Sequence, residues 1–173
     1  MAINQSVLVQ KGLEYKDVLH ESMRKSASAG TTKSAFLCHS HKDETLVKGL
    51  IALFQEAGID LYIDWKDHSM PETPNAETAR KIQDAIKARA FFLFLATANA
   101  KASRWCPWEI GYADSSMRKM FIIPTTDGAG TYGNEYLQLY AHVDIGTHET
   151  RSGLAVFNAG MTKGEWLSTT SFR

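Results

Sequence analysis

The run Phe91-Phe92-Leu93-Phe94-Leu95 is the most strand-like stretch of this 173-residue sequence. Five consecutive large apolar residues are typical of a strand that is covered on both faces, as the strands of a parallel sheet are. We therefore expect this segment to be the central strand of a sheet. Residues 35–38 and 120–123 are two further short apolar runs, the second stopped by Pro124, and both are predicted to be strands.

Between these runs the pattern changes to that of helices and a half-buried strand. Helical spacing recurs at Leu46, Val47, Leu50, Ile51 and Phe54, ahead of Gly58, and again at Ala79, Ile82 and Ile86. Residues 59–65 alternate between apolar and polar side chains, which predicts a strand. Residues 66–75 carry Pro71 and Pro74 and are predicted to be a loop, while residues 104–117 are predicted to be a helix.

Toward the two ends the pattern is weaker. We predict a turn-rich loop at 128–133, a short helix at 135–140 and a fifth strand at 141–145. Farther on, Thr162 and Glu165 fit the cap of a last short helix, as Ser40 and Asp43 fit a capping box at the start of an earlier one. The N-terminal segment is predicted to be a helix, with a stripe at Tyr15, Val18, Leu19 and Met23, and residues 26–32 a linker. The division expected is therefore 1–33, a helix and linker, and 34–173, the main domain.

Strands separated by helices of this length predict an α/β fold with a parallel sheet and helices on both faces. In such sheets ligands bind at the carboxyl ends of the strands, where the strand order reverses. Any site is therefore expected in the loops around Ser40, Trp65 and Thr97 and near the start of the helix at Trp105.

Composition narrows the class of protein. Lys plus Arg number 19, as do Asp plus Glu, so net charge does not indicate binding to nucleic acid or to a membrane. The longest apolar run is too short to span a bilayer, and we see no secretory signal. Cys38 and Cys106 form no pattern typical of a metal site or a disulfide framework and are expected to be small core residues. We expect a cytoplasmic protein.

Four segments, in the right order, resemble the TIR (Toll/interleukin-1 receptor) domain family over residues 34–145. The first box is Phe36-Leu37-Cys38-His39-Ser40-His41-Lys42-Asp43, the second is Leu61-Tyr62-Ile63-Asp64, and Phe121-Ile122-Ile123-Pro124 matches a later strand. The most specific is Ser103-Arg104-Trp105-Cys106-Pro107-Trp108-Glu109-Ile110, which contains the Trp-x-x-x-Glu pattern of TIR enzymes. The resemblance implies a flavodoxin-like, three-layer fold with a central five-stranded parallel sheet and an N-terminal helical extension. A stand-alone TIR domain of this length also resembles the signal-making component of bacterial Thoeris antiphage systems.

The resemblance places Glu109 at the position of the glutamate that cleaves NAD. Cleavage of the nicotinamide–ribose bond passes through a cationic, oxocarbenium-like sugar, which one carboxylate can stabilise. The leaving group is already cationic, so a general acid is not needed. Trp105 lies four residues earlier on the same helix face, where its ring could stack on the substrate or pack in the core. Trp108 and Ile110 are expected in the core.

Five further residues are candidates for binding NAD. Ser40 and His41 lie where a strand meets a helix, so backbone N–H groups there could receive phosphates, with His39 beside them. Asp64 and Trp65 end the second predicted strand, where the loop begins, and Trp65 could shelter the nucleotide. Each also has a simpler role open to it: Ser40 as a helix cap, Asp64 as a turn cap, Trp65 as cover for a sheet edge, and the histidines as packing or surface residues.

The resemblance implies NAD as substrate, with no further cofactor and no metal. The expected partners are copies of the chain itself, through TIR–TIR contacts, and a downstream effector that responds to the nucleotide product. Two other readings stay open: a non-enzymatic scaffold that self-associates through residues 71–75, and an enzyme like the nucleoside deoxyribosyltransferases. The run Ser103-Arg104-Trp105-Cys106 argues against the latter, and a phosphoacceptor receiver would need an acidic cluster that the sequence lacks.

Overall fold

The computed structural model describes residues 2–15, 34–66, 75–116 and 119–167. Its helices are α1 (Gln5–Glu14), α3 (Glu44–Glu56), α4 (Ala76–Lys87), α5 (Ala98–Lys101) and α6 (Trp105–Ser116). Its strands are β1 (Ile3–Asn4), β2 (Ser34–Cys38), β3 (Asp60–Tyr62), β4 (Phe91–Leu95), β5 (Met120–Ile123), β6 (Thr125–Thr126), β7 (Thr131–Tyr132), β8 (Ala141–His148), β9 (Arg151–Phe157) and β10 (Gly164–Trp166). Short 3-10 turns lie at His41–Asp43, Asp64–Lys66 and Asn134–Tyr136.

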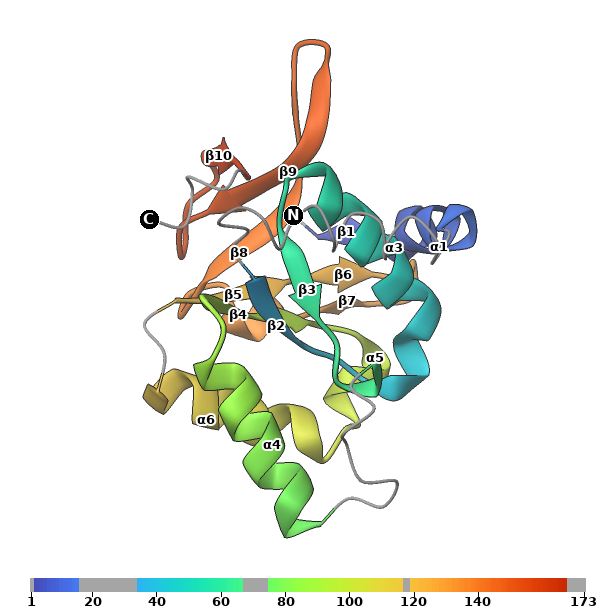
Figure 1. Ribbon diagram of the computed structural model, residues 1–173. Helices are drawn as coiled ribbons and strands as arrows, with labels where there is room; N and C mark the ends of the chain where they lie inside the picture. The colour runs from blue at the N-terminus through green and yellow to red at the C-terminus, as the bar shows by residue number, and fades with distance from the viewer. Residues whose placement is uncertain (1, 16–33, 67–74, 117–118, 168–173) are drawn as a thin grey trace.

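The main sheet has the strand order β10-β9-β8-β5-β4-β2-β3 (Figure 1). The five strands from β8 to β3 are parallel, and β4 lies in the middle of them, between β2 and β5. This confirms the predicted α/β fold, its parallel sheet and the central place of residues 91–95. Because β3 follows β2 on one side and β4 joins β2 on the other, the strand order reverses between β2 and β4.

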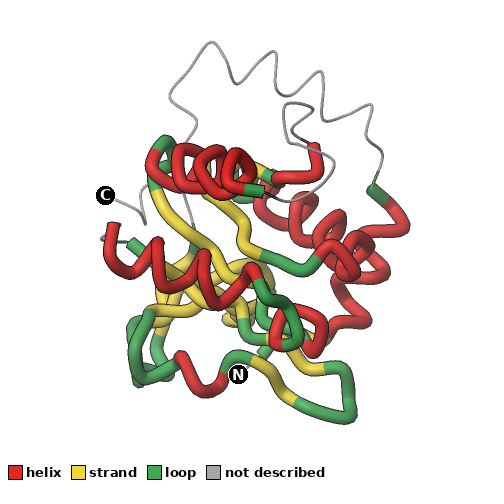
Figure 2. Tube along the Cα trace, turned by 90° about the horizontal axis from the view of Figure 1, so that it is seen from below, coloured by secondary structure: helices red, strands yellow, loops and turns green. Residues whose placement is uncertain are grey.

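Alternate residues of the central strands enter two separate cores. Phe91, Leu93 and Leu95 lie in one core with the buried face of α3, whereas Phe92 and Phe94 lie in the other with Ile82, Ile86 and Ile110. Accordingly, α3 and α1 cover one face of the sheet and α4 and α6 the other (Figure 1; Figure 2 shows the helices from below). The continuous apolar run of β4 is explained by this two-sided burial.

The N-terminal helix packs directly on α3, with no apolar stripe of the predicted kind. A Cβ added at Gly49 would lie 1.9 Å from the carbonyl oxygen of Leu8, and one at Gly12 would lie 2.2 Å from that of Thr45. The two helices therefore approach at backbone distance, through glycines. The helix ends at Glu14, so Tyr15, the first residue of the predicted stripe, does not belong to it. The other residues of the stripe and the predicted linker lie outside the described residues. In addition, β1 pairs with β6, which forms a small sheet with β7.

After the fifth parallel strand the chain turns back twice. Strand β8 continues to His148 and pairs antiparallel with β9, which pairs antiparallel with β10. The predicted helix capped by Thr162 and Glu165 is therefore wrong, because Glu165 lies in β10, opposite Val156. Gly164 and Glu165 are exposed, because β10 is the edge strand of the sheet.

Three smaller predictions also need correction. The strand predicted at 59–65 is only Asp60–Tyr62, and the chain then enters the 3-10 turn Asp64–Lys66. The helix predicted at 135–140 is the 3-10 turn Asn134–Tyr136, and the loop predicted at 128–133 includes β7. The prolines of the predicted loop at 66–75 lie outside the described residues. None of the helices in the described ranges is long and apolar enough to cross a bilayer.

Candidate active site

A cavity of about 270 Å³ opens at the carboxyl ends of β2, β3 and β4, beside the point where the strand order reverses. It is lined by His39, Ser40, His41 and Lys42 after β2, by Asp64 after β3, by Thr78 and Ile82 of α4, by Asn99, Ala102 and Ser103 between β4 and α6, and by Trp105 and Glu109 of α6. Six of the seven predicted site residues therefore line one cavity. The seventh, Trp65, does not.

Glu109 is the buried carboxyl group of this cavity. Ser103 caps α6 by accepting hydrogen bonds from the backbone N–H groups of Trp105 (3.2 Å) and Cys106 (3.3 Å), so Glu109 lies one turn inside the helix. The residue is 5 % exposed. Burial raises the pKa of Glu109 to about 8, although a hydrogen bond with the Cys38 thiol opposes the shift. Among the described residues it has no cationic partner, so the site holds a buried carboxyl group without an ion pair.

The two tryptophans of α6 are not fully buried: Trp105 is half-buried and Trp108 is exposed. Trp105 lines the cavity and meets Trp108 edge to face, with ring centroids 5.5 Å apart. Trp108 in turn stacks on Tyr112, at 6.0 Å and 16°. Ile110 is buried as predicted, but Trp108 is 37 % exposed, so its predicted place in the core is wrong.

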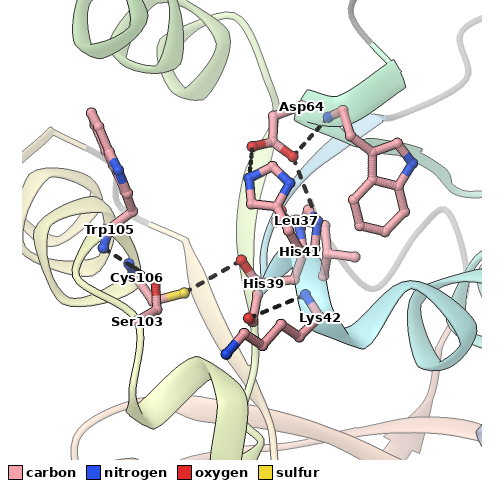
Figure 3. A network of polar contacts seen from close by, with 10 residues as sticks. Leu37, His39, His41, Lys42, Asp64, Ser103, Trp105 and Cys106 are labelled. Atoms are coloured by element: carbon pink, nitrogen blue, oxygen red, sulfur yellow. Dashed lines mark hydrogen bonds and ion pairs between the residues drawn. The ribbon is translucent and has the colours of Figure 1, made fainter. Parts of the chain in front are cut away.

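His39, His41 and Asp64 lie close together at one side of the cavity (Figure 3), and the ring of Trp65 packs against that of His39 to complete the cluster. The Nδ1 of His39 lies 2.9 Å from the carbonyl oxygen of Leu37. Because a carbonyl only accepts, Nδ1 carries a proton. The Nε2 of His39 lies 3.5 Å from one oxygen of Asp64, and the Nε2 of His41 lies 3.4 Å from the other. Burial lowers the pKa of His39, and the nearby Asp64 carboxylate opposes that shift.

Trp65 does not line the cavity but packs against His39, which does. Its ring meets that of His39 edge to face, with centroids 4.5 Å apart. Asp64 also accepts a hydrogen bond from the backbone N–H of Trp65, at 2.8 Å, so it caps its own turn. Asp64 thus has the structural role considered for it as well as a place in the lining.

The turn after β2 brings one cation to the cavity. The side chain of Ser40 accepts a long hydrogen bond, 3.4 Å, from the backbone N–H of Lys42, just before α3. The expected capping box is absent, because Asp43 makes no side-chain cap and binds the segment after β4 instead. Lys42 lines the cavity and supplies positive charge beside the N-terminus of α3. An anionic group can therefore be received here.

Two residues were not predicted as part of the site: Asn99, which lines the cavity, and Asp43, which lies behind it and holds Asn99. Asp43 is 4 % exposed and accepts hydrogen bonds from Thr97 and from Asn99. A polar residue soon after a central strand was the available signal for Asn99. The two cysteines are buried and free, as expected, and the Cys106 thiol donates to the carbonyl oxygen of His39 at 3.4 Å. In the described part of the chain no three His, Cys, Asp or Glu side chains are grouped to hold a metal ion.

A parallel α/β sheet with its cavity at the switch point, and a buried carboxyl group in that cavity, defines a small-molecule site of the doubly wound class. The profile of the family described as TIR domain matches residues 35–153, more than half of the chain. The chain belongs to the TIR domain family. It is 28 % identical over 151 residues to a probable 3′ cyclic ADP-D-ribose synthase ThsB′ of Bacillus cereus (strain MSX-D12), covering 84 % of this chain and 78 % of that protein.

A second relative is a putative cyclic ADP-D-ribose synthase TIR2 of Cytobacillus dafuensis. Identity is 28 % over 97 residues, which cover 54 % of this chain but 26 % of that protein. The shared part is thus about a quarter of the second relative's length.

Proposed function

We propose that this chain is an NAD-cleaving TIR enzyme, a glycohydrolase or cyclase. It breaks the nicotinamide–ribose bond of NAD and makes a signalling nucleotide derived from ADP-ribose. The observation that carries the proposal is the Glu109 carboxyl, buried in the wall of the cavity within the Trp-x-x-x-Glu pattern. The names of the two relatives, both called cyclic ADP-D-ribose synthases, support a cyclic product.

In the proposed reaction Glu109 acts as a carboxylate. As the bond to nicotinamide breaks, positive charge develops on the ribose, and a fixed, buried negative charge stabilises it more than water would. Nicotinamide leaves as a neutral molecule, so no proton need be delivered to it. The acceptor of the sugar is then either water, which gives ADP-ribose, or a hydroxyl of the same molecule, which gives a cyclic product.

The remaining lining residues suit the rest of NAD. Lys42 and the backbone at Ser40 and His41 offer positive charge and N–H donors for the pyrophosphate. Trp105 offers a flat apolar surface beside Glu109, which suits a nicotinamide or adenine ring. His39 and Asp64 line the opposite wall, and Trp65 packs behind His39.

The biological role follows from the product. We propose a role in bacterial antiphage immunity of the Thoeris type, in which the nucleotide activates a downstream effector. Self-association through TIR–TIR contacts stays a prediction, because the loop expected to mediate it lies largely outside the described residues.

Identification of the product tests the proposal. Purified protein, over a range of concentrations, is incubated with NAD, and products are followed by liquid chromatography and mass spectrometry. Equimolar nicotinamide together with a nucleotide of the mass of ADP-ribose minus water supports a cyclase, and the mass of ADP-ribose itself supports a glycohydrolase. Unchanged NAD, both with pure protein and in lysate from phage-infected cells, would contradict the proposal.

A further inference from the structure

A buried hydrogen-bond network joins the ends of β2 and β4 behind the cavity. Asp43 follows β2, and one of its carboxylate oxygens accepts the hydroxyl proton of Thr97, at 2.5 Å. Its other oxygen accepts from the Nδ2 of Asn99, at 2.7 Å. Thr97 in addition accepts the backbone N–H of Ala100, at 2.9 Å. Both oxygens of a 4 % exposed carboxylate are therefore used to hold the segment after β4.

The network determines which way the Asn99 amide points. A carboxylate only accepts, so the group of Asn99 that faces Asp43 must be its NH₂. The amide oxygen and the second N–H are then left for other partners. Asn99 lines the cavity while Asp43 does not. The cavity wall thus presents one oriented carboxamide, which can accept from a hydroxyl group and donate to it.

We propose that Asn99 binds a hydroxyl of the nicotinamide-bearing ribose and that Asp43 is the positioning residue that orients its amide, an inference that rests on the proposed function. A sugar hydroxyl is both donor and acceptor, which matches the two free groups of a carboxamide. Glu109 lines the same cavity and must face the anomeric carbon of that ribose. The two residues together would hold the sugar while its bond to nicotinamide is broken.

This role differs from a merely structural one in a measurable way. A residue that only stabilises the fold affects NAD and its analogues alike, whereas a residue that binds one hydroxyl loses its effect when that hydroxyl is missing. The probes are two analogues of NAD, each with one hydroxyl of the nicotinamide-bearing ribose replaced by hydrogen. The readout is the ratio of kcat/KM for NAD to kcat/KM for the analogue. Intrinsic differences in reactivity cancel when this ratio is compared between variants.

For Asn99→Ala we expect kcat/KM for NAD to fall roughly tenfold, the effect of one lost hydrogen bond to substrate. For one of the two analogues the ratio should fall by a similar factor relative to wild type. Asp43→Asn should lower the same ratio, because an asparagine side chain has one accepting oxygen and cannot accept from both Thr97 and Asn99 as the carboxylate does. The matched control is Asn134→Ala, the same change at an exposed position outside the cavity, which should leave kcat/KM and the ratio unchanged.

The outcomes separate this inference from the function on which it rests. If wild-type protein consumes NAD and Glu109→Gln does not, but Asn99→Ala shows the wild-type ratio with both analogues, the assignment of Asn99 is overturned and the proposed function stands. If Asp43→Asn lowers the melting temperature but keeps the wild-type ratio, its positioning role is overturned. If wild-type protein does not consume NAD, the proposed function fails and takes this inference with it.

Discussion

Glu109 has an environment that is unfavourable for a carboxylate and favourable for the proposed reaction. Removal of its charge from water is costly, and no cation among the described residues offsets the cost. NAD itself supplies the missing cation, first on the nicotinamide ring and then on the ribose. The binding of substrate should therefore favour the charged form of Glu109, at the position and moment where that charge is needed.

The pH dependence of catalysis follows from the pKa of about 8 for Glu109 in the free protein. Below that pH the carboxyl is neutral and cannot stabilise the cationic sugar. We expect kcat/KM to rise about tenfold per unit between roughly pH 6 and 8 and then to level off. The corresponding rise in the kcat profile should be shifted to lower pH, because the positively charged nicotinamide ring of bound NAD lowers the pKa of Glu109. Steady-state rates, corrected for breakdown of NAD in buffer, measure both profiles, and a kcat/KM that is flat over this range would contradict the assignment.

The same pKa predicts a stability effect of Glu109→Gln. The folded-state pKa lies above the ordinary value of 4.5, so the folded protein holds a proton that the unfolded chain releases. This contribution to stability is complete below about pH 4.5 and is lost as the pH rises through about 8. Glutamine avoids the loss, so the variant should be more stable than wild type near pH 8, by on the order of a few kcal/mol, and similar to it near pH 5. Denaturant unfolding at the two pH values measures the difference; a destabilised variant at pH 8 would be inconsistent with a buried, unpaired carboxyl.

At the scale of elements, the contact between α1 and α3 depends on two glycines. A side chain at Gly49 would collide with the backbone of α1, and backbone cannot give way as the end of a flexible side chain can. This explains why α1 buries only Leu8 and Gly12 and why no amphipathic stripe marks it in the sequence. The prediction of an N-terminal helix from later residues used the signal that was visible, whereas close glycine packing leaves almost none.

Gly49→Ala should therefore detach α1 from α3 and lower the melting temperature by several degrees, because a close helix contact is lost. Gly111→Ala is the matched control. It is the same substitution inside α6, with nothing within 4 Å of the added Cβ, so it should stabilise the protein by about 0.5–1 kcal/mol. Thermal unfolding of both variants tests the pair. Equal effects of the two substitutions would mean that α1 does not pack at this distance.

At the scale of the whole molecule, the parallel core could be predicted and its additions could not. The continuous apolar run at Phe91–Leu95 reflects burial of the strand on both faces, which is typical of a parallel strand covered by helices. The helical spacing before it marks one of those helices. In β9 and β10 the same cue is weak, because these strands extend the sheet at its edge, and the spacing of Thr162 and Glu165 imitates a helix cap. The location of the site followed from topology, since loops after parallel strands converge. Asn99 and Asp43 were missed because the sequence does not show which strand ends face one another.

The most direct test of the account is nicotinamide release from NAD by wild-type protein, Glu109→Gln and Glu165→Gln, with folding checked by circular dichroism. Glu165 is exposed on β10, outside the cavity, and so matches the substitution without touching the site. We predict that wild type and Glu165→Gln release nicotinamide at similar rates. Glu109→Gln should be slower by at least a hundredfold while remaining folded. Release by folded Glu109→Gln at the wild-type rate would show that the buried carboxylate does not cleave NAD.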